Sequence, residues 1–442
     1  MKSNTKVLML GWEFPPFVEG GLAGATFGLV NALRRHADIT LILPKYKPTK
    51  IWENVKVIGL DHAHVLVERG ILGYRSSAYY KNFIDNKLNI FEKLAGPYPD
   101  SSTKRIRKES NPISIVSDIV TSDETILNNL KWLSSKDVYG DGIWGQLEVY
   151  KTASTIIAQK LDFDVIHAHD WVTFLTGVQI KIMTGKPLVI HVHSLETDRI
   201  NEHVRNEIYD IEKYAMQHAD KIFPVSEYTK SKIIELYQID ESKIAAIHNG
   251  ITVYEDSKRW FHPLNRQIVA YVGRITSQKG TTILMETAAK VIQRNRQTLF
   301  VIAGKGDQLS NIMMEAAKRK ISSNIVFTGF IKEHEVDKLL ATADVYFMPS
   351  VSEPFGLSAL EAVRAGTPCV ISKQSGVSEV LPDSHIADFW DVDKFADLIS
   401  SILEKKVNGQ EFAIKESKKK LKNISWELAA NKILEHYKTI LN

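Results

Sequence analysis

The chain alternates between short, mostly apolar runs and longer segments with an apolar stripe at helical spacing. The runs at 7–11, 39–43 and 165–169 lack strict apolar–polar alternation, which is typical of parallel strands buried on both faces. Between the first two runs lie a Gly-Gly pair at 20–21 and a helical segment. This order predicts a βαβ unit in which the two glycines let the backbone approach a ligand closely.

The alternation of strands and helices resumes at residue 147 and continues to about residue 250. Ser226 is expected to cap the helix that follows it. Residues 60–145 interrupt the pattern with polar clusters, and we expect an irregular insertion there, of the kind that often shapes one side of a binding cleft. The expected elements of this part are strands at 187–192, 221–225 and 244–247 and helices at 147–160, 205–218 and 227–237.

A second series of strands and helices begins at residue 267, after a polar stretch at 256–263 that is the best linker candidate. The expected elements are strands at 268–273, 298–303, 325–328, 343–348 and 369–372 and helices at 281–294, 309–320, 333–342, 357–365 and 392–403. A chain of 442 residues is too long for one ordinary core. We therefore predict an α/β fold of two doubly wound Rossmann-like domains that face each other across a cleft.

The expected division of the chain follows from these two series. The first domain is expected to span residues 1–255, and the second is expected to span residues 256–424. A final segment, 425–442, has the apolar spacing of a helix and is expected to cross back to the first domain.

Composition narrows the class of protein. The net charge of +4 results from 56 basic and 52 acidic residues, a near balance that argues against a nucleic-acid binder. No apolar run approaches the length of a membrane-spanning helix, and the short run at 7–12 indicates a first strand rather than a signal peptide. We therefore expect a cytoplasmic protein; the sequence permits membrane association but does not indicate it. The single cysteine, Cys369, excludes an internal disulfide, and a small buried hydrophobe is its expected role.

The segment 349–366 carries two acidic residues around the start of a helix. Glu353 precedes the helix, and Glu361 lies within it. The two carboxylates would repel a phosphate but can accept hydrogen bonds from the hydroxyls of sugars. The alternative is an ordinary helix N-terminus whose acids only suit its dipole. Between the acids, three backbone amides lack a helical partner and would attract anions and hydroxyl oxygens, those of Phe355, Gly356 and Leu357.

Two cations lie in the loop after the expected strand at 268–273. Arg274 and Lys279 would stand beside a helix N-terminus at the carboxyl end of that strand, where ligands of such sheets bind. Fixed cations next to unpaired amides are what a diphosphate requires, although a surface loop with ordinary charges is the alternative. Gly304 closes the next strand in a similar loop, which is a weak signal. The dinucleotide glycine fingerprint is absent after the first strand, which argues against a nicotinamide enzyme.

Two pairs of histidines recur at the ends of expected strands, His167 with His169 and His191 with His193. Residues two apart in a strand share a face, so each pair could ligate a metal. No acidic or cysteine cluster lies nearby in the sequence to complete such a site, so we expect no metal there. One or two of these histidines are expected to donate hydrogen bonds in the cleft.

Several motifs, in this order and spacing, resemble the retaining GT-B glycosyltransferases, the family that joins glycogen synthases with family-four transferases. The segment HVHSLETDR at 191–199 resembles the glycogen-synthase-like branch of this family. The other motifs are Gly20-Gly21-Leu22, HAHDW at 167–171, VGRI…KG at 272–280, EPFGLSALEA at 353–362 and Ser425-Trp426-Glu427.

The resemblance implies a nucleotide-sugar donor that is held mostly by the C-terminal domain. Arg274 and Lys279 would hold its diphosphate, and Glu361 would accept hydrogen bonds from its ribose. Glu353 would accept from the hydroxyls of the sugar, while His169 would contact the transferred sugar and favour charge development in the transition state. Further contacts to the donor would come from Gly20, Gly21, Gly304, Phe355, Gly356 and Leu357.

The resemblance also implies a mechanism. Such enzymes retain the anomeric configuration by front-face attack, in which the leaving phosphate accepts the proton of the acceptor. Neither a metal nor a cofactor would be required, and closure of the two domains would limit hydrolysis of the donor.

Two departures bear on the substrate. Val18 stands where glycogen synthases carry lysine, and Val172 stands where they carry histidine. Both favour the broader family-four class. The leading prediction is transfer of a hexose, glucose first, from UDP-glucose or ADP-glucose to an α-glucan. The alternatives are a transferase with a lipid or cell-wall acceptor and a catalytically inactive protein that binds sugar nucleotides.

Overall fold

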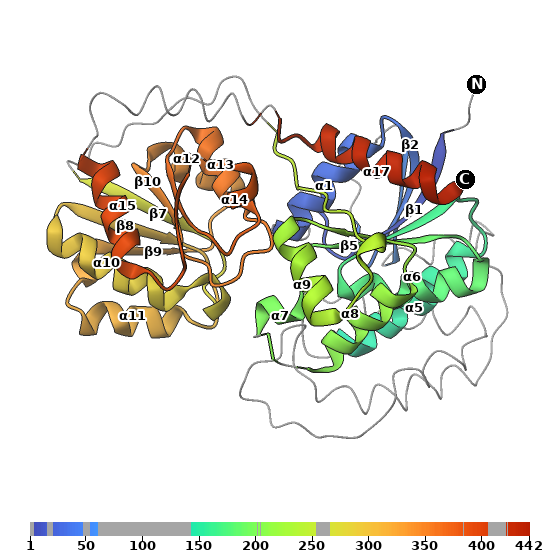
Figure 1. Ribbon diagram of the computed structural model, residues 1–442, viewed down its shortest axis with the longest axis horizontal. Helices are drawn as coiled ribbons and strands as arrows, with labels where there is room; N and C mark the ends of the chain where they lie inside the picture. Colours follow the sequence, from blue (N-terminus) through green and yellow to red (C-terminus); the bar gives the residue numbers. More distant parts are fainter. Residues whose placement is uncertain are drawn as a thin grey trace.

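The computed structural model describes residues 4–15, 21–46, 54–60, 143–200, 202–203, 205–252, 266–382, 384–404, 421 and 423–442. These residues form two α/β units, each built on a parallel sheet with helices on both faces (Figure 1). The predicted α/β class with two doubly wound sheets is confirmed. The expected linker at 256–263 and most of the expected insertion at 60–145 lie outside the described residues.

The N-terminal unit has a six-stranded sheet in the order β3-β2-β1-β4-β5-β6, with every described pairing parallel. Parallel strands put all their carboxyl ends at one edge, where loops can bring side chains together. Its strands are β1 (Thr5–Leu10), β2 (Ala37–Leu43), β3 (Val55–Gly59), β4 (Val165–His169), β5 (Leu188–Val192) and β6 (Lys221–Pro224). Its helices are α1 (Gly21–Leu33), α5 (Ile143–Ala158), α6 (Trp171–Thr184), α7 (Glu196–Arg199), α8 (Glu207–His218) and α9 (Glu227–Tyr237).

The C-terminal unit repeats the design with the strand order β12-β11-β10-β7-β8-β9. The chain enters at a central strand, runs to one edge and then crosses back, which leaves a switch point between β7 and β10. Its strands are β7 (Gln267–Val272), β8 (Thr298–Ala303), β9 (Ile325–Gly329), β10 (Val345–Met348), β11 (Cys369–Ser372) and β12 (His385–Ala387). Its helices are α10 (Thr281–Arg294), α11 (Leu309–Lys318), α12 (Glu333–Thr342), α13 (Leu357–Ala365), α14 (Val377–Val380) and α15 (Val392–Glu404).

The last helix, α17 (Trp426–Leu441), packs on the N-terminal unit beside α1, far from the sheet that precedes it in sequence (Figure 1). Ser425 caps it by accepting a hydrogen bond from the amide of Leu428. The indole of Trp426 lies directly over Gly28 of α1, where an added Cβ would come within 2.2 Å of the ring. The fully buried Ile433 and Tyr437 of α17 join the core on this face of the sheet.

Apolar residues fill both faces of both sheets. Core clusters lie on the two faces of the N-terminal sheet and on the two faces of the C-terminal sheet. Cys369 is buried in one of them, as expected. The predicted cap at Ser226 is confirmed, because its side chain accepts a hydrogen bond from the amide of Thr229.

Two expectations about the N-terminal unit are wrong, and one of its strands was missed. The segment 244–247 is not a regular strand, although its amides at Ala245 and Ile247 donate to β6. Pro224 of β6 lacks the amide that would return a bond to this segment, so the ladder stays incomplete. Strand β3 was not expected, and α5 begins at Ile143, inside the range given to the insertion.

Candidate active site

The structure brings Lys279 and Glu353 into direct contact at the carboxyl edge of the C-terminal sheet. Lys279 ends a short 3-10 helix, Ser277–Lys279, that follows β7, and Glu353 lies in the loop that follows β10. The Lys279 Nζ to Glu353 Oε2 distance is 2.6 Å, with the two side chains 16% and 10% exposed. Ser350 also donates to Glu353 Oε2, at 3.2 Å. The two strands are neighbours at the switch point, so the sheet topology explains the contact.

Two helix N-termini border this ion pair. Helix α10 starts after Gly280 and α13 starts after Gly356, and no side chain caps either helix. Gly280 has φ of 68°, and a Cβ there would lie 1.9 Å from the carbonyl oxygen of Pro349, so the two loops touch through backbone alone. Gly356 has φ of 108°, which favours glycine. Amides at uncapped N-termini are available to an anion or a hydroxyl oxygen.

Arg274 and Gly304 lie in the loops on the same edge, but not in the ion pair. The Arg274 side chain is exposed, and one of its Nη atoms is 3.5 Å from Gln278 Oε1. A Cβ at Gly304, where φ is 148°, would lie 1.8 Å from the carbonyl oxygen of Gly273. Close packing of two loops is therefore enough to explain this glycine, and its contact with a ligand stays a prediction.

Glu361 lies on the second turn of α13 and is half-buried. Burial raises the pKa of its carboxyl, Arg364 lowers that pKa by a smaller amount, and the acids Asp337 and Glu333 raise it further. Its ribose contact stays a prediction. Of the two expected glycines in the N-terminal unit, Gly21 opens α1 in an exposed position with open space around it, and Gly20 lies outside the described residues.

Four histidines form a buried stack at the ends of β4 and β5. His169 Nδ1 is 2.9 Å from His193 Nε2, and His167 Nε2 is 3.3 Å from His191 Nδ1. The Tyr437 hydroxyl of α17 is 2.5 Å from His167 Nδ1. Burial lowers the pKa of His167 and His193 to about 3 and that of His169 and His191 well below the usual value. All four imidazoles are therefore neutral at pH 7.

His169 is 1% exposed, and its Nε2 is a buried polar atom with no hydrogen-bond partner among the described residues. Such an atom is costly unless something binds it. The neighbouring Asp170 fixes the surroundings, since its Oδ1 accepts from the amide of His193 at 2.7 Å. Asp170 also has φ of 59°, a strained conformation for a residue with a side chain, at the strand-to-helix turn. This turn therefore holds the ends of β4 and β5 together.

The histidine stack is poorly shaped for a metal ion, although nitrogen atoms of His167, His169 and His191 all lie within 4.8 Å of one another. The three rings are nearly parallel, with interplanar angles of 20°, 10° and 13°. A histidine binds a metal through a lone pair in its own ring plane, and stacked planes do not meet at one point. Metal binding by these three residues would require their rings to turn, and the expectation of no metal stays a prediction.

A further set of polar side chains joins the two units next to Glu353, and no local motif predicted it. Ser352 contacts Asp198 of α7 and Lys232 of α9. These residues are separated by 154 and 120 positions in the chain. Spacing along a sequence contains no information on such contacts between domains.

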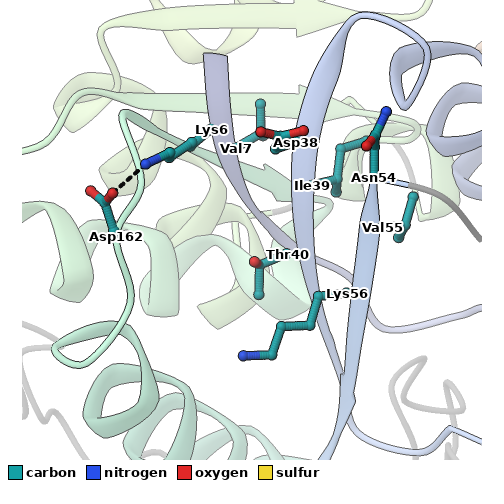
Figure 2. Close-up of a pocket in the computed structure, with 9 residues that line it drawn as sticks. All are labelled: Lys6, Val7, Asp38, Ile39, Thr40, Asn54, Val55, Lys56 and Asp162. Carbon is teal, nitrogen blue, oxygen red and sulfur yellow. Dashed lines mark hydrogen bonds and ion pairs between the residues drawn. The ribbon is translucent and has the colours of Figure 1, made fainter. Parts of the chain in front are cut away.

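A hollow of about 360 Å³ lies away from all these residues, at the amino ends of β1, β2 and β3 (Figure 2). Lys6 forms an ion pair with Asp162 across it, and Lys56 and Asp38 also line it. Ligands of parallel α/β sheets bind at the carboxyl ends of the strands, which is the other edge. We therefore place the candidate site at the ion pair and the histidines.

Comparison with known proteins agrees with the two-unit α/β fold and identifies the family. Residues 253–423 match the family described as Glycosyl transferases group 1, residues 141–254 match Glycosyltransferase Family 4, and residues 6–120 match the Starch synthase catalytic domain. An uncharacterised glycosyltransferase of Methanocaldococcus jannaschii is 30% identical, and the alignment covers 98% of each chain. The chain belongs to the GT-B glycosyltransferase family.

Two other similarities concern a more distant relative and a structure. A glycogen synthase of Mycobacterium tuberculosis is 27% identical to this glycosyltransferase over 62% of this chain and 68% of its own. The crystal structure of an Anabaena protein in complex with UDP and glucose has a TM-score of 0.62 at 15% identity, covering 99% of this chain and 100% of that one. The latter similarity shows the shared fold. Among the described residues, no helix is long and apolar enough to span a bilayer.

Proposed function

We propose that this glycosyltransferase transfers glucose, with retention of anomeric configuration, from UDP-glucose or ADP-glucose to an α-glucan. The observation that carries the proposal is the contact of Lys279 with Glu353 beside two uncapped helix N-termini. A cation and backbone amides suit a diphosphate, and a carboxylate suits the hydroxyls of a sugar. The glycogen synthase relative and the UDP and glucose held by the Anabaena protein support this donor class.

Each residue near the ion pair has a role in this proposal. Lys279 and Arg274 hold the diphosphate, and Arg274 is exposed and so accessible to it. Glu353 accepts hydrogen bonds from the hydroxyls of the sugar, and Glu361 accepts from the ribose. The amides at the start of α13 contact the sugar through residues 355–357. Gly20 and Gly21 let the loop before α1 approach the phosphates.

His169 contacts the transferred sugar through Nε2, one of three buried histidine nitrogens in the stack that have no hydrogen-bond partner among the described residues. Its other nitrogen is held by His193 at 2.9 Å, which fixes the ring. A neutral imidazole can donate one hydrogen bond without adding a positive charge that would compete with Lys279 for the phosphates.

The reaction proceeds on one face of the sugar. The hydroxyl oxygen of the acceptor forms a bond to C1 of glucose as the bond from C1 to the diphosphate oxygen breaks. The proton of the acceptor passes to that phosphate oxygen, so the leaving nucleoside diphosphate acts as the base. Lys279, Arg274 and the helix N-termini stabilise the charge that develops on the diphosphate. Neither a metal ion nor a cofactor takes part.

A screen of donors against acceptors tests this proposal. The purified chain is incubated with UDP-glucose, ADP-glucose and other sugar nucleotides, each with maltooligosaccharides, glycogen, and lipid-linked or cell-wall acceptors. We expect mass spectrometry to detect addition of hexose units to the maltooligosaccharides from one of the glucose donors. Proton NMR of the product should show an α-linkage.

Two outcomes would contradict the proposal. Transfer only to lipid-linked or cell-wall acceptors would assign the chain to that branch of the family. Binding of sugar nucleotides without turnover on any acceptor would indicate an inactive binding protein.

A further inference from the structure

The hydroxyl of Ser352, the residue before Glu353, is fully engaged by side chains of the N-terminal unit. Ser352 Oγ donates to Asp198 Oδ1 at 2.7 Å, and Lys232 Nζ donates to Ser352 Oγ at 3.0 Å. The Tyr228 hydroxyl lies 3.1 Å from the same atom. A serine hydroxyl has one proton and two lone pairs, so with Asp198 as acceptor the other two groups act as donors. The Ser352 hydroxyl thus uses all its hydrogen-bonding capacity across the interface.

Two of the N-terminal partners of Ser352, Asp198 and Lys232, also form a buried ion pair. Lys232 Nζ is 2.9 Å from Asp198 Oδ1, and the side chains are 7% and 1% exposed. Burial alone would lower the pKa of Lys232, but Asp198, Tyr228 and Glu202 together outweigh it and raise the pKa to about 12. Lys232 is therefore charged at pH 7. Buried charges of this kind are retained only where their hydrogen bonds are satisfied, and Ser352 satisfies one of them.

Helix α7 holds Asp198 in a fixed place. Arg199 donates to Glu196 Oε2 at 2.7 Å and to Glu212 Oε1 at 2.8 Å, with all three side chains at most 5% exposed. The second carboxylate oxygen of Asp198 accepts from the amide of Leu195 at 2.9 Å. The segment 193–199, which contains α7, begins with His193, and His193 contacts His169. One rigid connection therefore joins the histidine side of the site to the loop of Glu353.

Contacts on the other side of Glu353 repeat this arrangement. The Ser226 hydroxyl donates to the carbonyl oxygen of Pro354 at 2.6 Å. Glu379 of α14 accepts from the amides of Glu227 and Tyr228 at the start of α9, at 3.0 and 2.7 Å. Residues before and after Glu353 are thus both held by the N-terminal unit.

We propose that Asp198 and Lys232 are positioning residues that hold Ser352, and through it place the Glu353 carboxylate for the donor sugar. The inference rests on the proposed function, because Glu353 is assigned there to the sugar. Neither residue touches the substrate. Their effect is to make the position of Glu353 depend on the N-terminal unit as well as on its own sheet.

The test uses Ser352→Ala in the full-length chain, because this change removes one hydroxyl and leaves the Asp198–Lys232 ion pair in place. We expect kcat with the glucose donor to fall by roughly 10- to 100-fold, the loss typical of a displaced catalytic group. Binding of UDP alone, measured by titration calorimetry, should stay within about twofold, since UDP lacks the sugar. Ser352→Thr keeps a hydroxyl and should recover most of kcat. Ser378→Ala is the matched control, because that hydroxyl donates within the C-terminal unit, to the carbonyl of Ser375 at 2.6 Å.

Hydrogen exchange separates failure of this inference from failure of the proposed function. Peptides covering residues 350–358 should exchange faster in Ser352→Ala than in the wild type, and peptides of Ser378→Ala over the same range should not. This readout does not require activity, so it holds even if the wild type transfers no sugar. Wild-type kcat and unchanged exchange in Ser352→Ala would overturn the inference.

Discussion

At the scale of single residues, the ion pair of Lys279 and Glu353 suits two different states of the site. In the absence of a donor, Glu353 compensates the charge of Lys279, which is only 16% exposed. In the proposed function, a bound diphosphate would give Lys279 a second anionic partner, and Glu353 would accept hydrogen bonds from the hydroxyls of the sugar. The environment of Glu361 is different. Burial raises the pKa of its carboxyl, and Arg364 lowers that pKa by a smaller amount.

The two glutamates should therefore respond differently to substitution. We expect Glu361→Ala to weaken donor binding about tenfold, equivalent to about 1.4 kcal/mol, the value of one or two lost hydrogen bonds. Glu353→Ala should mainly lower kcat. Calorimetry with the glucose donor and steady-state kinetics measure the two effects, with Glu315→Ala on the surface of α11 as control. Equal loss of stability in both variants with unchanged donor affinity would contradict the assignment.

The buried histidines govern how stability depends on pH. Burial holds the pKa of His167 and His193 near 3, below the ordinary value of 6.5. Between these values the unfolded chain binds more protons than the folded one, so the free energy of unfolding decreases as the pH falls below about 6.5. Asp170 and Glu212 act in the opposite sense, because burial raises their pKa to about 7. Burial also raises the pKa of Glu361, which acts in the same sense as these two carboxyls. The contribution of the histidines taken alone is destabilisation by acid.

Removal of one histidine from the stack should reduce this acid sensitivity. His191→Phe keeps an aromatic ring but no titrating group. Between pH 6.5 and 5, the free energy of unfolding of this variant should fall less steeply than that of the wild type, by about 1.4 kcal/mol per pH unit. Urea unfolding at several pH values measures the slope. His334→Phe, at an exposed position of α12, is the control, and equal slopes in the two variants would argue against neutral buried histidines.

At the scale of elements, α17 packs on the N-terminal unit with its Trp426 ring against Gly28 of α1. The ring of Trp426 occupies the space that a side chain at Gly28 would need. At the other end of α17, the Tyr437 hydroxyl forms a hydrogen bond with His167 Nδ1. This helix therefore supports the histidine stack as well as the core.

Two glycines of α1 provide a matched test of this docking. Gly28→Ala would place a methyl group 2.2 Å from the Trp426 ring, and we expect it to lower the free energy of unfolding by about 1–3 kcal/mol, as overpacking does. Gly24→Ala meets nothing within 4 Å and should raise it by about 0.5–1 kcal/mol, because alanine favours a helix. Chemical denaturation measures both. A similar effect of the two changes would show that α17 does not pack on Gly28.

Local pattern predicted most elements, and its failures have physical causes. Helices α10 and α13 were predicted with the observed bounds, since Gly280 and Gly366 in the left-handed region punctuate them. The placement of Lys279 and Glu353 at one edge of the sheet followed from one rule, that parallel strands end at a common edge, but their direct contact was not predicted. The contacts of Ser352 with Asp198 and Lys232 had no such rule, because they depend on how two domains pack.

At the scale of the whole molecule, the proposed function assigns different parts of the reaction to the two units. The C-terminal unit presents a cation, a carboxylate and two helix N-termini, which suit a nucleotide sugar. The N-terminal unit presents neutral buried histidines and the side chains that hold Ser352. The match to Glycosyl transferases group 1 spans residues 253–423, which include the whole C-terminal sheet. The proposed donor site is built around the contact of Lys279 with Glu353, so loss of Lys279 should affect donor binding most.

Donor affinity of Lys279→Met is the most direct measurement. The matched control is Lys318→Met, because Lys318 also pairs with a glutamate, Glu315 at 3.0 Å, but its side chain is 70% exposed on α11. Titration calorimetry with UDP-glucose and ADP-glucose gives the dissociation constants of both variants and the wild type. We expect Lys279→Met to bind the preferred donor at least tenfold more weakly than the wild type, and Lys318→Met to bind it like the wild type. Wild-type affinity in Lys279→Met would contradict a nucleotide-sugar site at the ion pair with Glu353.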